Sequence, residues 1–344
     1  MTRDYHVEDT KDAKILSGEK CHFFFNKRTG YFVSWGENPE QDCEGLPGPA
    51  ILDMEVTTKC SGGCPFCYKS NSPEGENMPL ETFKSLVDKL PSTVTQIALG
   101  ADSDLSSNPD IFEMMRYVRE KGIVPNITLA SATEDVADEL ARLCGAVAVS
   151  RYEDPDKCYD TVFKLVSRGM KQVNIHLMLS KETLGIAYQT LTDLETDPRL
   201  IGVNALVFLS LKQKGHGEGY SPLSQEEFDE VVDSALLHPN FKLGFDSCSA
   251  SKIYSYTNSR VYSPIGKNSI IPCEATLESG YINVKGEFFP CSFVEGTEDW
   301  ERGIDILGCS DFIEEVWNNE RVSSFRESLL NQTTPCRSCP KFKV

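Results

Sequence analysis

The middle of the chain alternates short apolar runs with longer amphipathic stretches. In the amphipathic stretches, apolar residues recur three and four positions apart, as they do on one face of a helix; Phe83, Leu86, Val87 and Leu90 are an example. The apolar runs have the length and composition of buried strands and cover residues 51–56, 96–99, 124–129, 146–149, 172–179 and 204–211. Six strand–helix pairs in succession predict a parallel sheet covered by helices.

Capping residues mark where these helices begin. Ser224 and Glu227 have the spacing of a capping box before an apolar helical face. Gly122 and Gly145 follow the second and third helical stretches, in the position where a helix commonly ends. The other predicted starts are at Pro79, Asn108-Pro109, Thr133, Asp154-Pro155 and Ser180.

The segments on either side lack this alternation. Residues 21–33 contain two aromatic runs around an Asn-to-Gly turn, which predicts a β-hairpin packed on the sheet. After residue 246 the rhythm stops and cysteines become frequent. We therefore divide the chain into an N-terminal hairpin extension (1–49), an α/β unit (50–246) and a smaller cysteine-containing domain (247–344).

Composition and charge narrow the class of protein. The net charge of -18 disfavours binding to a nucleic-acid backbone, because that backbone is held mainly by Lys and Arg. No apolar run approaches the ~18 residues of a membrane span, and the N-terminus carries acids where a signal peptide needs a cationic start. We expect a cytoplasmic protein with reduced thiols. In that compartment, clustered cysteines among the 13 present more often bind metal than form disulfides.

Cys60, Cys64 and Cys67 form a CxxxCxxC loop directly after the first predicted strand. A four-iron four-sulfur cluster has four ligand positions, so three thiolates leave one iron open to a substrate or cofactor. The spacing differs from the CxxC of thioredoxin-type redox sites and from the paired CxxC knuckles of structural zinc. A zinc or disulfide loop is the alternative interpretation.

This loop resembles the defining motif of the radical S-adenosylmethionine (SAM) superfamily, CxxxCxΦC, in which Φ is aromatic or aliphatic and corresponds here to Phe66. The resemblance implies an α/β fold, a partial (β/α)6 TIM-like barrel. It also implies that the three cysteines bind a 4Fe-4S cluster, that SAM chelates the open iron, and that Phe66 lies beside the adenine. The reduced cluster would then cleave SAM to methionine and a 5′-deoxyadenosyl radical, which abstracts hydrogen from a substrate.

The ends of the other strands are where such a barrel would hold SAM, because parallel barrels place their active sites at the carboxyl ends of strands. The second strand ends in Gly100, Ala101 and Asp102, where the family usually has Gly-Gly-Glu to receive the SAM ammonium; Ala101 and the shorter Asp102 depart from that pattern. By the same resemblance, Ser150 and Arg151 after the fourth strand would bind the SAM carboxylate and ribose. A surface ion pair is the alternative for the arginine.

Alternation along the fifth strand turns Asn174 and His176 toward the barrel interior, where they are placed to contact SAM or substrate. A single interior histidine is more often a hydrogen-bonded structural residue. On the sixth strand, Leu209 is placed to pack on the adenine. The loop that follows, residues 212–220, is rich in glycine and lacks a phosphate-binding motif, which favours a mobile lid or a substrate loop.

The cysteines after residue 246 resemble the SPASM/twitch extension of one branch of the superfamily. That extension has a cysteine, a β-hairpin and a GxxxxC sequence, which Cys273, Gly286 and Cys291 match, followed later by a CxxC. The resemblance implies an auxiliary 4Fe-4S cluster in the shorter twitch form, because a full SPASM domain has three further cysteines. A four-cysteine zinc site is the alternative. The predicted ligands are Cys273, Cys291, Cys336 and Cys339.

Two further cysteines have more than one candidate role. Cys309 is an alternative ligand of the auxiliary cluster. Cys248 follows a seventh strand-like segment, between the barrel and the extension. It is a candidate hydrogen-atom donor to a substrate radical, an alternative cluster ligand, or a packing residue, and ligation or packing together are favoured over donation.

The resemblance implies an enzyme and covers the chain from about residue 50 onward. In the SPASM/twitch branch the commonest substrates are ribosomally made peptides or proteins, which are cross-linked, epimerised or oxidised. The first expectation is therefore a peptide- or protein-modifying radical SAM enzyme that receives electrons from a flavodoxin- or ferredoxin-type donor. A radical SAM enzyme acting on a small molecule, such as a nucleoside, sugar or cofactor precursor, is the second. A non-catalytic iron–sulfur electron carrier or sensor is the third.

Overall fold

The computed structural model describes residues 5–38, 41, 43, 45–238, 241–266, 270 and 273–331. Their framework is a ten-stranded sheet whose order is β11-β10-β9-β8-β7-β6-β5-β12-β13-β14, and all pairs from β11 to β12 are parallel. This order is linear, so in the described ranges the sheet is open rather than closed into a barrel. The strands of the predicted α/β unit are β5 (Ile51–Glu55), β6 (Gln96–Gly100), β7 (Val124–Leu129), β8 (Val147–Ser150), β9 (Val173–Leu179), β10 (Ala205–Ser210) and β11 (Lys242–Phe245).

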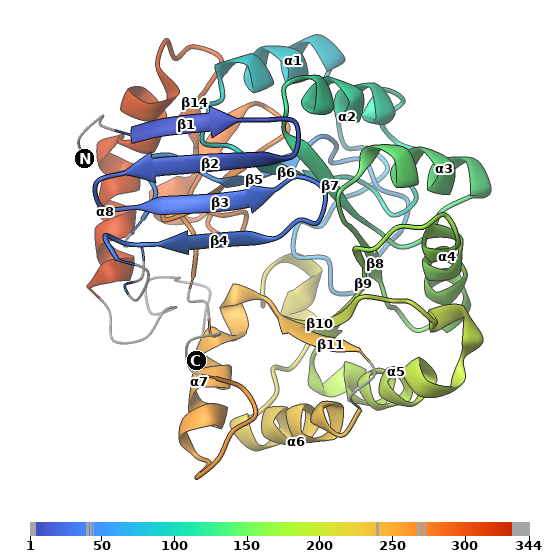
Figure 1. Ribbon diagram of the computed structural model, residues 1–344. Helices are drawn as coiled ribbons and strands as arrows, with labels where there is room; N and C mark the ends of the chain where they lie inside the picture. The colour runs from blue at the N-terminus through green and yellow to red at the C-terminus, as the bar shows by residue number, and fades with distance from the viewer. Residues whose placement is uncertain are drawn as a thin grey trace.

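Helices α1 to α6 each follow one of the strands β5 to β10, and they lie in an arc along the outer side of the sheet (Figure 1). The predicted mixed α/β fold with six strand–helix units is confirmed. Nowhere in the described ranges is a helix long and apolar enough to cross a membrane. The helices are α1 (Leu80–Lys89), α2 (Ile111–Glu120), α3 (Glu134–Leu143), α4 (Pro155–Ser167), α5 (Leu184–Thr196) and α6 (Gln225–Leu236).

Side-chain caps are present at four of the six predicted helix starts. Thr133 accepts a hydrogen bond from the first turn of α3, and Asp154 does the same for α4. Ser224 and Glu227 form the expected capping box before α6. Ser180 caps a short 3-10 turn, and α5 begins directly after that turn. The local sequence therefore determines where each helix begins, and so where the strand before it ends.

The N-terminal segment forms a four-stranded antiparallel sheet rather than a lone hairpin. The predicted hairpin is present as β3 and β4, and β1 and β2 precede it. Phe23 and Phe25 are fully buried and pack with Leu16 against Val124, the first residue of β7. The small sheet therefore covers the amino ends of the parallel strands, as Figure 1 shows. Its strands are β1 (Tyr5–Asp9), β2 (Ala13–Gly18), β3 (His22–Asn26) and β4 (Phe32–Trp35).

Cys21 and Cys43 form a disulfide, with their Cα atoms 5.3 Å apart. This differs from the expectation of reduced thiols throughout. The reason is the topology of the small sheet: His22 pairs with Trp35, so the chain after β4 returns beside the start of β3.

The segment after residue 246 continues the large sheet. Its first strand, β12, pairs in parallel with β5, and the next two extend the edge in antiparallel fashion. Trp317 is fully buried, and its indole N–H donates to the Leu46 carbonyl at 3.2 Å, which also ties this segment to the N-terminal part. Its elements are α7 (Ala250–Asn258), β12 (Ser279–Ile282), β13 (Glu287–Phe289), β14 (Ile304–Asp305) and α8 (Glu320–Leu330).

Candidate functional site

The CxxxCxxC loop leaves the carboxyl end of β5 and returns to α1. The Cys60 amide donates to the Ser72 carbonyl at 2.9 Å, which closes the base of the loop. Within it, the Cys67 amide donates to the Cys64 carbonyl at 3.1 Å, so the chain turns back on itself between these two cysteines. All three thiols are half-buried. The loop therefore lies at the edge of the sheet where a parallel α/β fold places its active site.

The three thiols are close enough to influence one another. Burial raises the pKa of the Cys64 thiol, a hydrogen bond with Tyr152 opposes the rise, and the neighbouring Cys67 and Cys60 thiolates add to it. Among the described residues, no three His, Cys, Asp or Glu side chains converge closely enough to hold a single metal ion.

Phe66 lies between two tyrosine rings. Its centroid is 5.6 Å from that of Tyr152 and 5.6 Å from that of Tyr220, which it meets edge-on. Tyr152 comes from the turn after β8 and Tyr220 from the loop after β10. We call these three residues the aromatic group. It forms an apolar wall beside the cysteines, a surface on which a flat ring such as adenine can stack. The contact between Phe66 and adenine stays a prediction.

The glycine-rich loop after β10 packs directly on the cysteine loop. The His216 amide donates to the Cys67 carbonyl at 3.0 Å, and the His216 ring Nδ1 is 3.3 Å from the Cys64 carbonyl oxygen. Gly215 has a φ of +57°, and a Cβ there would lie 2.8 Å from the Cys67 carbonyl oxygen. Any other residue would push the two loops apart. Residues 212–220 therefore support the cysteine loop from one side.

Asp102, two residues after β6, has one satisfied and one unsatisfied carboxylate oxygen. The residue is 2% exposed, and its Oδ2 accepts hydrogen bonds from the Ser106 and Ser107 amides, both at 3.2 Å. Its Oδ1 is shielded from solvent and has no donor in the described part of the chain. Burial raises the pKa of Asp102, and a hydrogen bond with Asp104 adds to the rise. A cationic ligand such as an ammonium group would satisfy this oxygen and recover the cost of burying it.

Ser150 and Arg151 lie beside the aromatic group, at the end of β8. Ser150 is half-buried and hydrogen-bonds with the Tyr152 hydroxyl. Arg151 is 4% exposed, and its guanidinium donates to the Tyr152 and Glu153 carbonyls. Arg151 thus holds the turn after β8. Its predicted contact with SAM, and that of Ser150, stay predictions.

The other residues predicted to contact SAM lie at different distances from the carboxyl edge of the sheet. Gly100 is the exposed last residue of β6, and Ala101 follows it half-buried. Leu209 is half-buried near the carboxyl end of β10. Asn174 is near the amino end of β9, and its side-chain oxygen already accepts a hydrogen bond from Asn204 at 2.7 Å. The structure therefore places Asn174 farther from the cysteine edge than the other three.

His176 and Cys248 lie near an ion pair at the carboxyl ends of β10 and β11. Lys212 Nζ is 3.1 Å from Asp246 Oδ2, and Lys212 also hydrogen-bonds with Cys248. Burial opposes the charged form of Lys212, but Asp246 and Cys248 outweigh it and raise the lysine pKa. Burial lowers the pKa of His176 to about 4, against the influence of Asp246, so its imidazole is neutral at pH 7. The role of Cys248 stays a prediction.

Lys69, two residues after the cysteine motif, is a half-buried cation held by three acceptors. Its Nζ is 3.2 Å from Glu55 Oε1 and 2.7 Å from the Tyr281 hydroxyl, and it also pairs with Glu295. Burial raises the pKa of Glu55 while Lys69 opposes the rise. Burial also opposes ionisation of Glu295, yet Lys69 and a hydrogen bond from Asn283 lower the Glu295 pKa overall. We call Lys69, Glu55, Glu295 and Tyr281 the Lys69 network.

The segment directly after Cys291 is fixed by the loops of the parallel sheet. The Tyr68 hydroxyl donates to Ser292 Oγ at 3.0 Å, which links this segment to the cysteine loop. Lys214, from the glycine-rich loop, donates to the Glu295 carbonyl at 2.6 Å. Together with the Lys69 network, these bonds join the segment to both loops that surround the CxxxCxxC cysteines.

The predicted auxiliary-cluster ligands are only partly within the described residues. Cys273 and Cys291 are half-buried, and Cys336 and Cys339 lie outside the described ranges. Cys309 is 5% exposed, and its carbonyl accepts a hydrogen bond from the end of α1. The ligand set, and the alternative role of Cys309, stay predictions.

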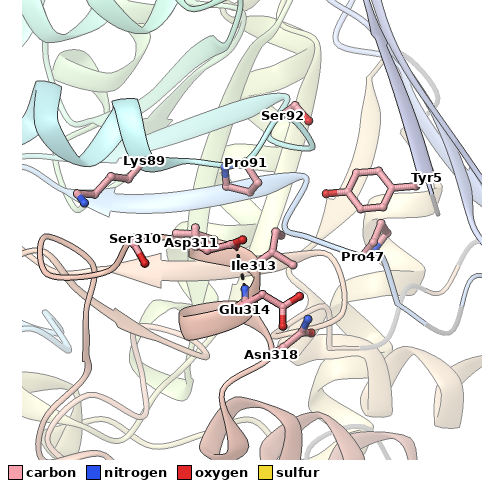
Figure 2. A pocket seen from close by; sticks show the side chains of 11 residues that line it. Tyr5, Pro47, Lys89, Pro91, Ser92, Ser310, Asp311, Ile313, Glu314 and Asn318 are labelled. Atoms are coloured by element: carbon pink, nitrogen blue, oxygen red, sulfur yellow. Dashed lines mark hydrogen bonds between the residues drawn. The ribbon is translucent and has the colours of Figure 1, made fainter. Parts of the chain in front are cut away.

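A hollow of about 540 Å³ lies apart from these residues (Figure 2). The end of α1 and the turn into β6 form one wall, so the hollow is at the amino edge of the sheet, opposite the cysteine loop. In Figure 2, Asp311 points at the Glu314 amide, 3.1 Å away, and so caps a turn. The hollow contains none of the predicted site residues. It is lined by Tyr5, Pro47, Lys89, Pro91, Ser92, Ser310, Asp311, Phe312, Ile313, Glu314 and Asn318.

Comparisons with known proteins match both parts of the chain. Residues 273–340 match the model of the SPASM family, an iron-sulfur cluster-binding domain. The fold is similar to that of SuiB from Streptococcus suis. The crystal structure of SuiB bound to the precursor peptide SuiA has a TM-score of 0.71 at 12% identity, over 93% of this chain and 90% of SuiB. The structure bound to S-adenosylmethionine has a TM-score of 0.64 at 13% identity, over 99% and 93%. No curated protein sequence matches the chain.

The chain thus joins a SPASM-type, iron-sulfur cluster-binding domain at residues 273–340 to an open parallel α/β sheet, with a CxxxCxxC loop at the carboxyl edge of that sheet. The fold of the whole chain is that of SuiB. At 12–13% identity, the likeness to SuiB concerns the fold; the bound peptide and SAM are facts about SuiB.

Sequence reasoning missed the Lys69 network and Tyr152. A signal for the network was present, because Asp53 and Glu55 alternate with buried residues in β5 and so place carboxylates on the inner side of the sheet. Carboxylates in that position call for a cation. Tyr152 had no comparable signal, because its contact with Cys64 depends on how Arg151 folds the turn after β8.

Replacing Lys69 by Met should lower the free energy of unfolding by about 3–5 kcal/mol, because it leaves the buried Glu55 without its cation and removes one of the two lysines that act on Glu295. Denaturant titration measures this cost. The control, Lys84→Met, removes a lysine that pairs at 3.1 Å with the exposed Glu81 and should cost far less.

The Lys69→Met deficit should also depend on pH. Without the lysine, the two carboxyls have higher pKa values in the folded chain than in the unfolded chain, so the folded state binds more protons and gains stability as pH falls. The deficit relative to the wild type should therefore shrink between pH 7 and pH 5. Equal costs for the two lysine variants, or a deficit that grows on acidification, would contradict the network.

Proposed function

We propose that this protein binds a 4Fe-4S cluster through Cys60, Cys64 and Cys67, binds SAM at the open iron, and uses SAM cleavage to abstract hydrogen from a substrate. The observation that carries the proposal is the buried Asp102 Oδ1, which lacks a donor, beside the cysteine loop. The two features adjoin, because a Cβ on Gly62 of the loop would lie 2.9 Å from the hydroxyl of the residue after Asp102. SAM is a zwitterionic sulfonium, so its site needs a metal to chelate and a negatively charged acceptor for its ammonium group. The cysteine loop and Asp102 would supply these two features.

The bound groups would supply the chemistry: one electron from the cluster breaks SAM into methionine and a 5′-deoxyadenosyl radical, which takes a hydrogen atom to become 5′-deoxyadenosine. The residues of this chain bind and orient. Asp102 accepts the SAM ammonium, with Gly100 and Ala101 as backbone acceptors beside it. Phe66 and Leu209 cover the adenine. The glycine-rich loop covers the back of the cysteine loop and limits the access of water.

We further propose that Cys273, Cys291, Cys336 and Cys339 bind an auxiliary 4Fe-4S cluster. The match of residues 273–340 to a cluster-binding domain supports this. So do the contacts that hold the segment after Cys291 against the cysteine loop, since a rigid ligand segment is needed to define a cluster site. A flavodoxin- or ferredoxin-type protein in the cytoplasm is the proposed electron donor.

A ribosomally made peptide or protein is the proposed substrate. The support is the similarity of fold to SuiB over 93% of this chain, since SuiB has been solved with the precursor peptide SuiA bound. The reaction would be a cross-link, thioether formation, epimerisation or oxidation of that peptide. Cys248 is a candidate hydrogen-atom donor in such a reaction, and Lys212 holds its side chain at the carboxyl edge of the sheet.

Cysteine variants test the two-cluster assignment. After anaerobic reconstitution with iron and sulfide, alanine at Cys60, Cys64 or Cys67 should abolish the formation of 5′-deoxyadenosine from SAM in the presence of dithionite. Alanine at Cys336 and Cys339 should remove about half of the bound iron and leave the first cluster in place. Iron analysis and chromatography of the products measure both outcomes. Wild-type protein that holds the three-cysteine cluster but forms no 5′-deoxyadenosine would refute the proposed enzyme.

Replacing Asp102 by Asn should weaken SAM binding about tenfold or more, because a charge-assisted hydrogen bond to the ammonium is lost. Asp104→Asn is the comparison variant: it removes one negative charge from the same turn and alters the hydrogen bond with Asp102, but it leaves the Asp102 carboxylate in place, so it should change the affinity less. Equilibrium binding of SAM to the reconstituted protein measures the difference. Equal weakening by both variants would assign the effect to the general charge of the turn.

A deuterium-transfer experiment tests the substrate class. A precursor peptide encoded beside the gene, deuterated throughout, should pass deuterium to 5′-deoxyadenosine during turnover, detected by mass spectrometry. The Cys60→Ala variant with the same peptide is the control and should give none. Transfer from a nucleoside or sugar, with none from any neighbouring peptide, would replace the peptide proposal with the small-molecule one.

A further inference from the structure

Tyr152 connects the turn after β8 to a predicted cluster ligand. Its hydroxyl is 3.1 Å from Cys64 Sγ, and its ring packs on Phe66. A phenol ordinarily keeps its proton at neutral pH. A cysteine that binds iron has lost its thiol proton. In the loaded protein, Tyr152 is therefore the donor of this hydrogen bond and the Cys64 sulfur is the acceptor.

The turn that carries Tyr152 is rigidly held. The Arg151 guanidinium donates to the carbonyl oxygens of Tyr152 and Glu153 and lies 5.4 Å over the ring of Tyr159. The Tyr159 hydroxyl in turn donates to Asp193 in α5 at 2.6 Å. This chain of contacts reaches from the outer helices to the turn, so the position of the phenol does not depend on the cysteine loop alone.

We propose that Tyr152 is a positioning residue that raises the reduction potential of the cluster bound by Cys60, Cys64 and Cys67, through its hydrogen bond to the Cys64 sulfur. The proposal rests on the proposed function of that loop. Reduction adds negative charge to the cluster and its thiolates, and a donor aimed at a ligand sulfur stabilises the reduced form more than the oxidised form. The hydrogen bond thus makes it easier to load the electron that SAM cleavage consumes.

The test compares Tyr152→Phe with Tyr220→Phe in protein reconstituted anaerobically with iron and sulfide. Both variants remove one hydroxyl from a ring that packs on Phe66, but only the Tyr152 hydroxyl is hydrogen-bonded to a described cysteine. The readout is a redox titration followed by electron paramagnetic resonance. The first cluster is identified as the one whose signal changes when SAM is added, which separates it from the auxiliary cluster.

Tyr152→Phe should shift the midpoint to a more negative potential, so that the ratio of reduced to oxidised cluster at the wild-type midpoint falls about three- to tenfold. Tyr220→Phe should leave the midpoint unchanged. An unchanged midpoint in Tyr152→Phe, or equal shifts in both variants, would overturn the proposal and leave the proposed function standing. Failure of Tyr152→Phe alone to bind iron would also overturn it, because the hydroxyl would then act in cluster assembly. Absence of a SAM-responsive signal in the wild type would instead refute the proposed function.

Discussion

A lysine buried between two carboxylates is the constraint on which the rest of the site depends. Lys69 and Glu55 have side chains that are 14% and 7% exposed, and an ion pair so far from water is stable only when every charge is compensated. The fold must therefore bring the end of β5, the cysteine loop, strand β12 and the segment after Cys291 to one point. The parallel pairing of β12 with β5, in which Tyr281 lies opposite Asp53, meets this requirement.

One consequence is that the segments of the two predicted cluster sites meet in one contact region. The cysteine loop contributes Tyr68 and Lys69 to it, and the cysteine-rich segment contributes Ser292 and Glu295. The glycine-rich loop supports both sides, through Gly215 on one and Lys214 on the other. A displacement of either cluster-binding segment must therefore strain the other. The SPASM segment is thus built into the large sheet and helps to hold the CxxxCxxC loop in place.

The sequence predicted the parts of this molecule that depend on local patterns. Helix caps such as Thr133, the order of strands and helices, and the position of the cysteine loop follow from residues close together in the chain. The first two strands of the small sheet were missed because their sequences lack the apolar–polar alternation of a half-buried strand; β2 is stabilised by pairing with the aromatic β3, and β1 by pairing with β2. The Lys69 network joins residues 55, 69, 281 and 295; the alternation in β5 indicates that Glu55 needs a cation, but no local pattern can identify its distant partners.

Several ionisable side chains lie on or beside the large sheet, but burial favours their uncharged forms. His176 is neutral at pH 7, since burial lowers its pKa to about 4. Asp53 is exposed to solvent, but the protein around it still raises its pKa to about 6. Burial and the neighbouring carboxylates raise the pKa of Glu274 to about 7. The proposed transfer of a hydrogen atom would move no net charge, so it would need fixed shape and hydrogen bonds more than compensating ions. Charge would arise at the proposed cluster, and Tyr152, which hydrogen-bonds to Cys64, and the Asp102 carboxylate are both at that end of the sheet.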